Sequence, residues 1–225
     1  MTQPLHPESS RPATVQRIPL WLKLAYSGFL AVMIPVYWVN YGPTNFLYFC
    51  DVALLLTLAG IWREDALLIS LPAVGILLPQ VLWCADFLTQ LCGGKMTGMT
   101  SYMFDAERSL FLRGLSLFHG WLPFLLLYLV RKTGYDSRAL LGWTTICMGL
   151  CLVAYFLLPP AGAVLASPQV PRNVNYVFGM DDAKPQQWLP PLAYLGVWIS
   201  ALTGIIFVPT HFLLKKACSA AGKVS

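Results

Sequence analysis

Long apolar stretches are the feature that most constrains how this chain can fold. A helix that crosses a bilayer needs roughly 20 apolar residues, each adding about 1.5 Å of rise. Six stretches approach or exceed that length: residues 21–39, 45–62, 66–90, 109–130, 139–158 and 190–214. Hydrophobic residues make up 57% of the chain and charged residues only 11%, with a mean hydropathy of +0.62. These values are typical of membrane proteins. We therefore expect an all-α, polytopic membrane protein built as a bundle of six transmembrane helices.

Lysine and arginine residues are distributed unequally between the two sides of these stretches. Ten lie on the side of the chain termini and five on the opposite side. Cytoplasmic loops carry the excess of Lys and Arg, so both termini are expected in the cytoplasm of a multi-pass inner-membrane protein. We interpret residues 1–18 as a disordered cytoplasmic lead, 19–216 as one transmembrane domain and 217–225 as a cytoplasmic tail.

The remaining composition narrows the choice of partners and cofactors. No basic patch is interleaved with stacking aromatic residues, so membrane lipids rather than nucleic acid are the expected partners. The six cysteines follow no metal-binding spacing, and the common nucleotide, zinc-protease and serine-hydrolase motifs are absent. We expect no metal and no cofactor. The oligomeric state and a disulfide between Cys84 and Cys92 are left open.

Several polar side chains lie inside the apolar stretches, where they are costly and are therefore functional candidates. Counting from the non-cytoplasmic ends at about 1.5 Å per residue predicts two tiers. The upper tier holds Asp51, Asp86 and Arg113, and the lower tier holds Gln80 and His119. We expect Arg113 to pair with one of the two carboxylates, which either fixes helix register or shapes a substrate-binding site.

His119 has no obvious charged neighbour in its own stretch. One interpretation is a neutral histidine that is hydrogen-bonded to Gln80 or Ser116. The other makes His119 a general base and Cys50 the paired nucleophile, because a thiol near an imidazole can form a reactive thiolate. Asp51 would then complete the catalytic set. Tyr48, at the same end of its stretch, is an alternative donor or nucleophile.

A polar and aromatic loop, residues 173–191, precedes the last apolar stretch. Tyr176 and Phe178 could plug a cavity at the mouth of the bundle, while Asn173 and Asn175 supply polar contacts. A lid and a simple surface loop are equally compatible with this pattern. We count Asn175 and Tyr176 as candidate substrate-binding residues.

Three short elements resemble a known group of proteins: FCDVALLL, SLFHGWLPFLLLYLV and NYVFGMDDAKP, in that order. Together they resemble the bacterial YwaF-type integral membrane proteins and the animal transmembrane-164-type proteins, which are regarded as membrane-embedded acyltransferases. A more distant similarity links them to the androgen-induced membrane hydrolases, which cleave fatty-acid esters of hydroxy fatty acids. The resemblance covers roughly residues 40–195.

The resemblance implies a role for particular positions. Cys50 and Asp51 would match the Cys-Asp pair of the family and His119 its active-site histidine. Asn175 and Tyr176 would match its loop element. The threonine nucleophile of the hydrolase branch falls near Tyr48, so that mechanism is not carried over.

We therefore expect a lipid acyltransferase or lipid-ester hydrolase with a membrane-embedded Cys/His site. Two alternatives remain open. In the first, Asp51, Asp86 and His119 form the relay of a small proton-coupled transporter. In the second, the chain is a non-catalytic membrane subunit whose polar residues only join helices.

Overall fold

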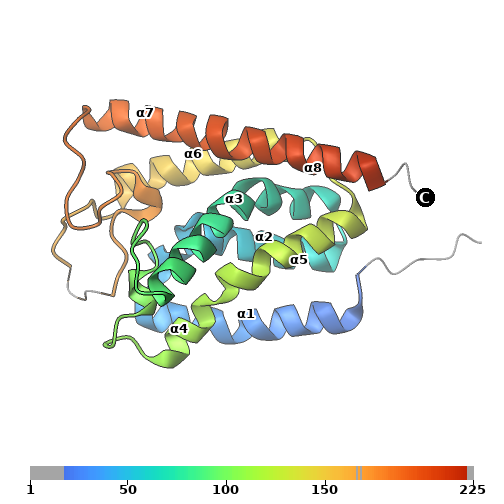
Figure 1. The fold of residues 1–225 in the computed structure, drawn as a ribbon, viewed down its shortest axis with the longest axis horizontal. Helices are drawn as coiled ribbons and strands as arrows, with labels where there is room; N and C mark the ends of the chain where they lie inside the picture. Colours follow the sequence, from blue (N-terminus) through green and yellow to red (C-terminus); the bar gives the residue numbers. More distant parts are fainter. Residues whose placement is uncertain (1–17, 166, 168, 222–225) are drawn as a thin grey trace, which may run out of the picture.

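The computed structural model describes residues 18–165, 167 and 169–221 and contains only helices and loops over that part of the chain (Figure 1). Eight α-helices follow one another: α1 (Leu20–Tyr41), α2 (Phe49–Arg63), α3 (Ala66–Leu91), α4 (Leu110–Ser116), α5 (Phe118–Thr133), α6 (Ala139–Leu157), α7 (Pro191–Ala201) and α8 (Val208–Ala221). Three 3-10 turns and one π-helical segment join them: η1 (Pro43–Leu47), η2 (Ser101–Met103), η3 (Val174–Tyr176) and the π-helical η4 (Leu202–Phe207).

Within the described part of the chain, five helical segments are long and apolar enough to cross a membrane. They are α1, α3, α4 with α5 as one unit (Leu110–Thr133), α6, and the run Pro191–Ser219 that joins α7, η4 and α8. The all-α, multi-pass prediction is confirmed to this extent. The predicted stretch 45–62 differs, because Pro43 starts the turn η1 and Tyr48 is extended, with φ −64° and ψ 144°. Helix α2 therefore begins only at Phe49 and has 15 residues.

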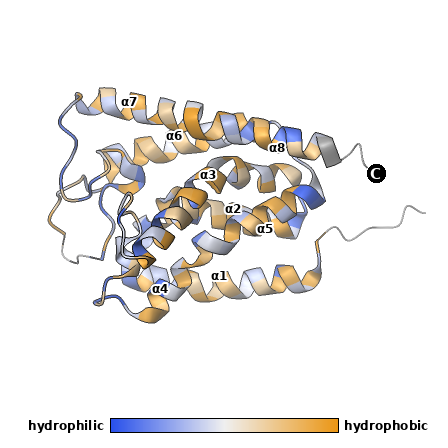
Figure 2. Ribbon diagram, in the orientation of Figure 1, coloured by the Kyte–Doolittle hydropathy of each residue, from blue (hydrophilic) through white to orange (hydrophobic). Residues whose placement is uncertain are grey.

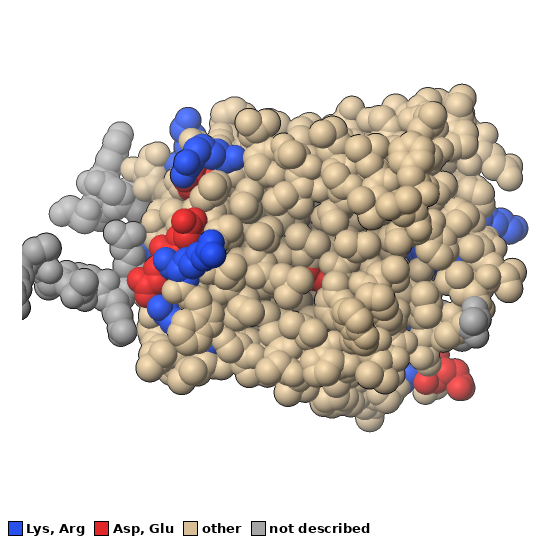
Figure 3. Space-filling model, turned by 180° about the vertical axis from the view of Figure 1, so that it is seen from behind, with Lys and Arg blue, Asp and Glu red and all other residues tan. Residues whose placement is uncertain are grey.

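The surface of the molecule is divided into bands along its long axis. Apolar residues follow the helices for most of their length (Figure 2). Seen from behind, the Lys, Arg, Asp and Glu side chains gather at the two ends, and the band between them consists almost entirely of other residues (Figure 3). Large apolar side chains such as Phe124 in α5, Leu141 in α6 and Ile205 in η4 are exposed. A lipid-facing surface has this distribution.

Local chemistry explains where several helices begin and end. Asp65 accepts a hydrogen bond from the Leu68 amide at 2.8 Å and caps α3, and Ser109 does the same for the Leu112 amide at 3.2 Å in α4. Pro191 begins α7, where a missing amide proton costs nothing. Gly134 ends α5 at φ +87°, a conformation that only glycine adopts freely.

Helix α3 is the central element of the bundle. It is the most buried of the candidate spans, and it packs against α2, α5, α6 and α8. The helix is continuous through Pro72 and Pro79. Gly75 permits the approach of α6, because a Cβ there would lie 1.8 Å from the indole ring of the fully buried Trp143. Trp143 therefore belongs to the core and not to an interfacial belt.

Two long segments are interrupted. The predicted stretch 109–130 is divided at Leu117 into α4 and α5, and the last stretch contains the π-helical η4. Such π segments are frequent at functional sites because they change the direction of side chains. Most of the predicted disordered lead lies outside the described residues, although Ile18 is fully buried. Helix α8 runs through Ala221, into the segment predicted as a tail.

Candidate functional site

A cavity of about 500 Å³ lies between α1, η1, α2, α3, α5 and η4, under the loop that contains η3. Pockets that hold small molecules fall in this size range. Seven of the nine sequence-predicted site residues line it: Tyr48, Cys50, Asp51, Gln80, His119, Asn175 and Tyr176. They come from segments more than 100 residues apart in the chain, so the fold brings them together.

Cys50 and Asp51 lie in the first turn of α2, where the positive end of the helix dipole favours a carboxylate. Asp51 is only 3% exposed. Its Oδ2 accepts hydrogen bonds from Cys50 Sγ at 3.6 Å and from Asn45 Nδ2 at 3.4 Å. Its other oxygen, Oδ1, is buried and has no hydrogen-bond partner in the described part of the chain. The thiol is therefore positioned by the adjacent carboxylate.

Asn175 organises the beginning of α2 from the distant loop. Its Oδ1 accepts from the amide of Phe49 at 3.0 Å, and its Nδ2 donates to the carbonyl of Leu47 at 2.9 Å. Tyr48, the residue before the helix, makes no side-chain cap of its own. Asn175 has φ +59° and Tyr176 also has φ +59°, a backbone region that is strained for both residues. The loop is thus held over the cavity by the hydrogen bonds through which its Asn175 caps the start of α2.

His119 is fixed by its own backbone and by aromatic rings. Its Nδ1 is 2.7 Å from the carbonyl of Ser116, which can only accept, so Nδ1 carries the proton and Nε2 is the free acceptor. That carbonyl is available because the helix is divided at Leu117: the Gly120 amide bonds instead to the Leu117 carbonyl at 2.9 Å. The imidazole stacks on Trp83 at 4.8 Å between ring centroids. Of the two hydrogen-bond partners considered in the non-catalytic interpretation, Gln80 and Ser116, the structure shows Ser116, through its backbone carbonyl.

Gln80 comes from α3 and is 3% exposed. Its Oε1 is buried and has no hydrogen-bond partner among the described residues. Together with Asp51 Oδ1 it gives the cavity two buried acceptors that the protein itself does not satisfy. Buried acceptors without partners are uncommon, and each requires an explanation.

Asp86 has a structural role that the sequence did not indicate. Its carboxylate is fully buried and accepts five hydrogen bonds, from the amides of Thr97, Gly98 and Thr100, the Thr100 hydroxyl and the Gln90 side chain, at 2.6–2.9 Å. These bonds hold the loop that follows α3. Asp86 does not line the cavity, and the carboxylate has little acceptor capacity left for a substrate.

Arg113 also lies apart from the cavity. The prediction that it pairs with Asp51 or Asp86 is wrong, because Arg113 forms no ion pair with any described residue. Its Nη1 donates instead to the carbonyl of Met103 at 3.2 Å. Backbone amides of the following loop supply the hydrogen bonds of the Asp86 carboxylate. Counting depth along a helix cannot reveal these bonds.

Sequence reasoning missed several residues of the site. Tyr37 lines the cavity with its hydroxyl oxygen 2.8 Å from that of Ser116, and Asn45 donates a hydrogen bond to Asp51. Arg108 lies at the loop end, where its guanidinium covers the rings of Tyr41 and Tyr102 at 5.6 and 5.5 Å. These residues are polar or aromatic groups at the ends of apolar stretches, where an interfacial position explains them equally well.

The phenols outside the spans remain protonated at neutral pH. Burial raises the pKa of Tyr176 to about 12, and burial also raises the pKa of Tyr102. Partial desolvation raises the pKa of Asp182, an exposed residue of the cavity lining, while a hydrogen bond from Asn173 opposes that rise. The cavity therefore presents neutral phenol groups beside the carboxyl groups of Asp51 and Asp182.

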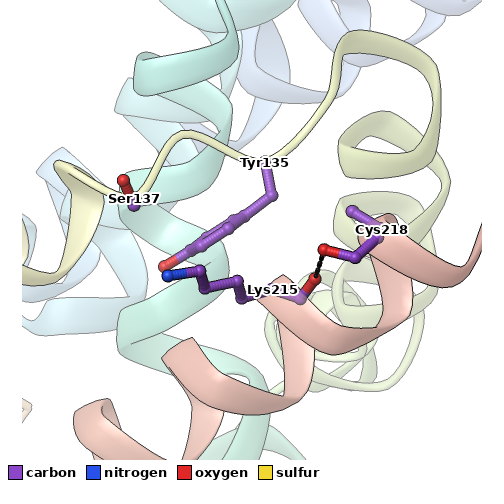
Figure 4. Close-up of a pocket in the computed structure, with 5 residues that line it drawn as sticks. Tyr135, Ser137, Lys215 and Cys218 are labelled. Carbon is purple, nitrogen blue, oxygen red and sulfur yellow. Dashed lines mark hydrogen bonds between the residues drawn. The ribbon is translucent and has the colours of Figure 1, made fainter. Parts of the chain in front are cut away.

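A second pocket, of about 320 Å³, lies at the other end of the bundle (Figure 4). It is lined by Tyr135, Ser137, Lys215, Cys218 and Ser219. Figure 4 shows the side chains of Tyr135 and Lys215 extending in the same direction. The Tyr135 hydroxyl is 2.6 Å from Nδ1 of His211, which is buried and joins α8 to the α5–α6 loop. None of the sequence-predicted site residues lies here.

Comparison of the chain with sequence models of protein families, with curated proteins and with solved structures finds no match. Groups of three or more metal-ligating side chains that could hold an ion are also absent from the described residues.

Proposed function

We propose that this chain is an integral membrane enzyme that transfers an acyl group between lipids or hydrolyses a lipid ester. Cys50 is the nucleophile, His119 the general base and Asp51 the group that positions the thiol. The observation that carries the proposal is that the thiol, the carboxylate and the imidazole line one cavity. Apolar and aromatic walls suit an acyl chain, and the polar groups suit an ester.

The reaction would proceed in two balanced steps. Cys50 Sγ attacks the ester carbonyl carbon, the S–C bond forms, the ester C–O bond breaks, and the thiol proton passes through His119 Nε2 to the leaving oxygen. A second hydroxyl, or water, then attacks the thioester. The new C–O bond forms, the S–C bond breaks, and the proton returns to the sulfur. The tautomer fixed by the Ser116 carbonyl leaves Nε2 as the acceptor that these transfers need.

The same proposal includes the way in which the chain crosses the membrane. Helix α2 would act with η1 as a sixth crossing, because it connects the end of α1 with the start of α3 and runs back between the two ends of the bundle (Figure 1). The excess of Lys and Arg at the end that holds the start of α1 and the end of α8 supports a cytoplasmic position for both termini. The cavity would then open toward the non-cytoplasmic leaflet of the inner membrane.

Lipid analysis of expressing cells tests the proposal. Cells that produce wild type, Cys50→Ala, His119→Ala or the control Cys92→Ala are compared for phospholipid and fatty-acid ester composition. Cys92 is an exposed free cysteine outside the cavity. Wild type and Cys92→Ala should share one altered lipid profile, and the two cavity variants should revert to that of cells without the protein. Identical lipid profiles in all four strains, at equal protein levels, would refute the proposed enzyme activity.

A further inference from the structure

Asp51 lacks a counter-charge. The carboxylate is almost completely buried, forms no ion pair with any described residue, and leaves Oδ1 without a hydrogen bond. A buried carboxylate in that state is costly unless a cation or several donors complete its shell. The two arginines that line the cavity are engaged elsewhere: Arg108 donates to the Tyr41 hydroxyl at 3.4 Å, and Arg172 donates to the Ala163 carbonyl at 2.9 Å.

Gln80 supplies a second open acceptor. Its Oε1 is buried without a partner and comes from α3, whereas Asp51 comes from α2. Helices α2 and α3 pack directly against each other. A group that satisfies both oxygens must therefore carry at least two donated protons. A hydroxyl has one, water has two and a primary ammonium group has three, and only the ammonium group also brings the positive charge that would compensate the Asp51 carboxylate.

The walls of the cavity suit a cation. Aromatic side chains that line it include Tyr37, Tyr48, Trp83, Phe118, Tyr176 and Trp198. Aromatic faces attract organic cations, more strongly when water is excluded. The loop end of the same cavity already holds one such contact, in which the guanidinium of Arg108 covers Tyr41 and Tyr102. The surroundings of Asp51 thus combine one carboxyl group, one neutral amide acceptor and several aromatic rings.

We propose that the cavity binds an amphiphile through a primary ammonium group, which donates to Asp51 Oδ1 and Gln80 Oε1 and lies against the aromatic walls. The inference rests on the proposed function in that it names the substrate class of the same cavity. Oδ2 of Asp51 remains with Cys50 and Asn45, so one carboxylate serves both the thiol and the substrate. An uncharged alcohol of equal length would leave the carboxylate uncompensated and should bind more weakly.

Binding of dodecylamine and dodecanol to the full-length protein in neutral detergent micelles tests this inference. Affinity is measured at pH 7 by thermophoresis for wild type, Asp51→Asn, Gln80→Leu and the control Asp181→Asn. Asp181 is an exposed carboxylate outside the cavity. Wild type and Asp181→Asn should prefer the amine on the order of tenfold over the alcohol. Asp51→Asn should lose that preference, and Gln80→Leu should reduce it.

Equal binding of amine and alcohol to wild type would overturn the inference, as would an undiminished preference in Asp51→Asn. If Asp51→Asn does not fold, the amine and alcohol affinities of Gln80→Leu are compared with those of wild type instead. An unchanged amine preference in Gln80→Leu would also overturn the inference. The outcomes separate the two proposals. An amine preference without lipid turnover would overturn only the proposed enzyme activity. Cys50-dependent lipid turnover without an amine preference would overturn only the proposed ammonium site.

Discussion

Asn175 Oδ1 accepts a hydrogen bond from the Phe49 amide at 3.0 Å, across 126 residues of sequence. This contact fastens the loop that contains η3 to the first turn of α2, where Cys50 and Asp51 lie. The same asparagine returns a bond from Nδ2 to the Leu47 carbonyl at 2.9 Å. Its backbone carbonyl accepts from the indole of Trp198 at 2.9 Å. One side chain and its backbone thus join three distant segments around the cavity.

Replacing Asn175 should therefore loosen the nucleophile as well as the loop. Asn175→Ala removes a helix cap and leaves the partly buried amide of Phe49 without a partner, which costs about 1–2 kcal/mol. Asn40→Ala is the control, because that side chain bonds only within its own helix, to the Val36 carbonyl. Thermal unfolding in detergent should show a clear loss for Asn175→Ala and a small one for Asn40→Ala. Equal losses would contradict the capping role.

Asp86 should matter for folding and not for ligand binding. Asp86→Ala removes the acceptor of five hydrogen bonds and leaves three buried or partly buried amides unpaired, which costs about 3 kcal/mol or more. Asp86→Asn keeps one acceptor oxygen and should lose less. Protease sensitivity of residues 92–108 and thermal unfolding measure the effect. An Asp86→Ala protein with wild-type stability would show that the loop does not depend on this carboxylate.

Gly75 and Trp143 form a tightly fitted pair. A methyl group at Gly75 would overlap the indole, so Gly75→Ala should destabilise the bundle by about 1–3 kcal/mol. Trp143→Phe shortens the ring at the point of overlap and should restore part of that loss in the double variant. Unfolding of the two single variants and the double variant measures the coupling. Strictly additive effects would mean that the two residues do not constrain each other.

Asp182 should make the stability of the folded protein depend on pH. Asp182 is an exposed residue of the cavity lining, and partial desolvation there raises the pKa of its carboxyl in the folded protein above the unfolded value of about 4. The folded state then binds more protons in that interval, so the contribution of Asp182 to stability is lost as pH rises through it. Asp182→Asn should be more stable than wild type at pH 7, and the difference should vanish below about pH 4. A difference that is constant from pH 3 to pH 7 would contradict this.

The membrane class of the fold could be predicted from the sequence because apolar length is a local property. Five of the six predicted stretches correspond to helices long enough to span. The stretch that begins at residue 45 does not, because its apolar letters conceal a turn at Pro43 and an extended Tyr48. The division of α4 and α5 at Leu117 was hidden in the same way, although it frees the carbonyl that orients His119.

The sequence could indicate which polar residues are buried, because burying them is costly. It could not indicate which of them find hydrogen-bond partners in the folded protein. Cys50, Asp51, Gln80 and His119 stand out as polar groups in apolar sequence, and they line one cavity. Asp86 gave the same signal, yet nearby amides satisfy it. Which buried carboxylate stays open depends on the loop that folds beside it, and the apolar pattern carries no information on that.

The central claim is that Cys50 carries an acyl group during turnover, and intact-mass spectrometry tests it most directly. Purified wild type, Cys50→Ala and His119→Ala are incubated with bilayers of bacterial phospholipid, quenched in acid and weighed. Wild type should gain the mass of one fatty acyl chain at Cys50, which hydroxylamine removes, and Cys50→Ala should gain none. An unmodified wild-type protein, or an adduct of equal extent in Cys50→Ala, would contradict the account.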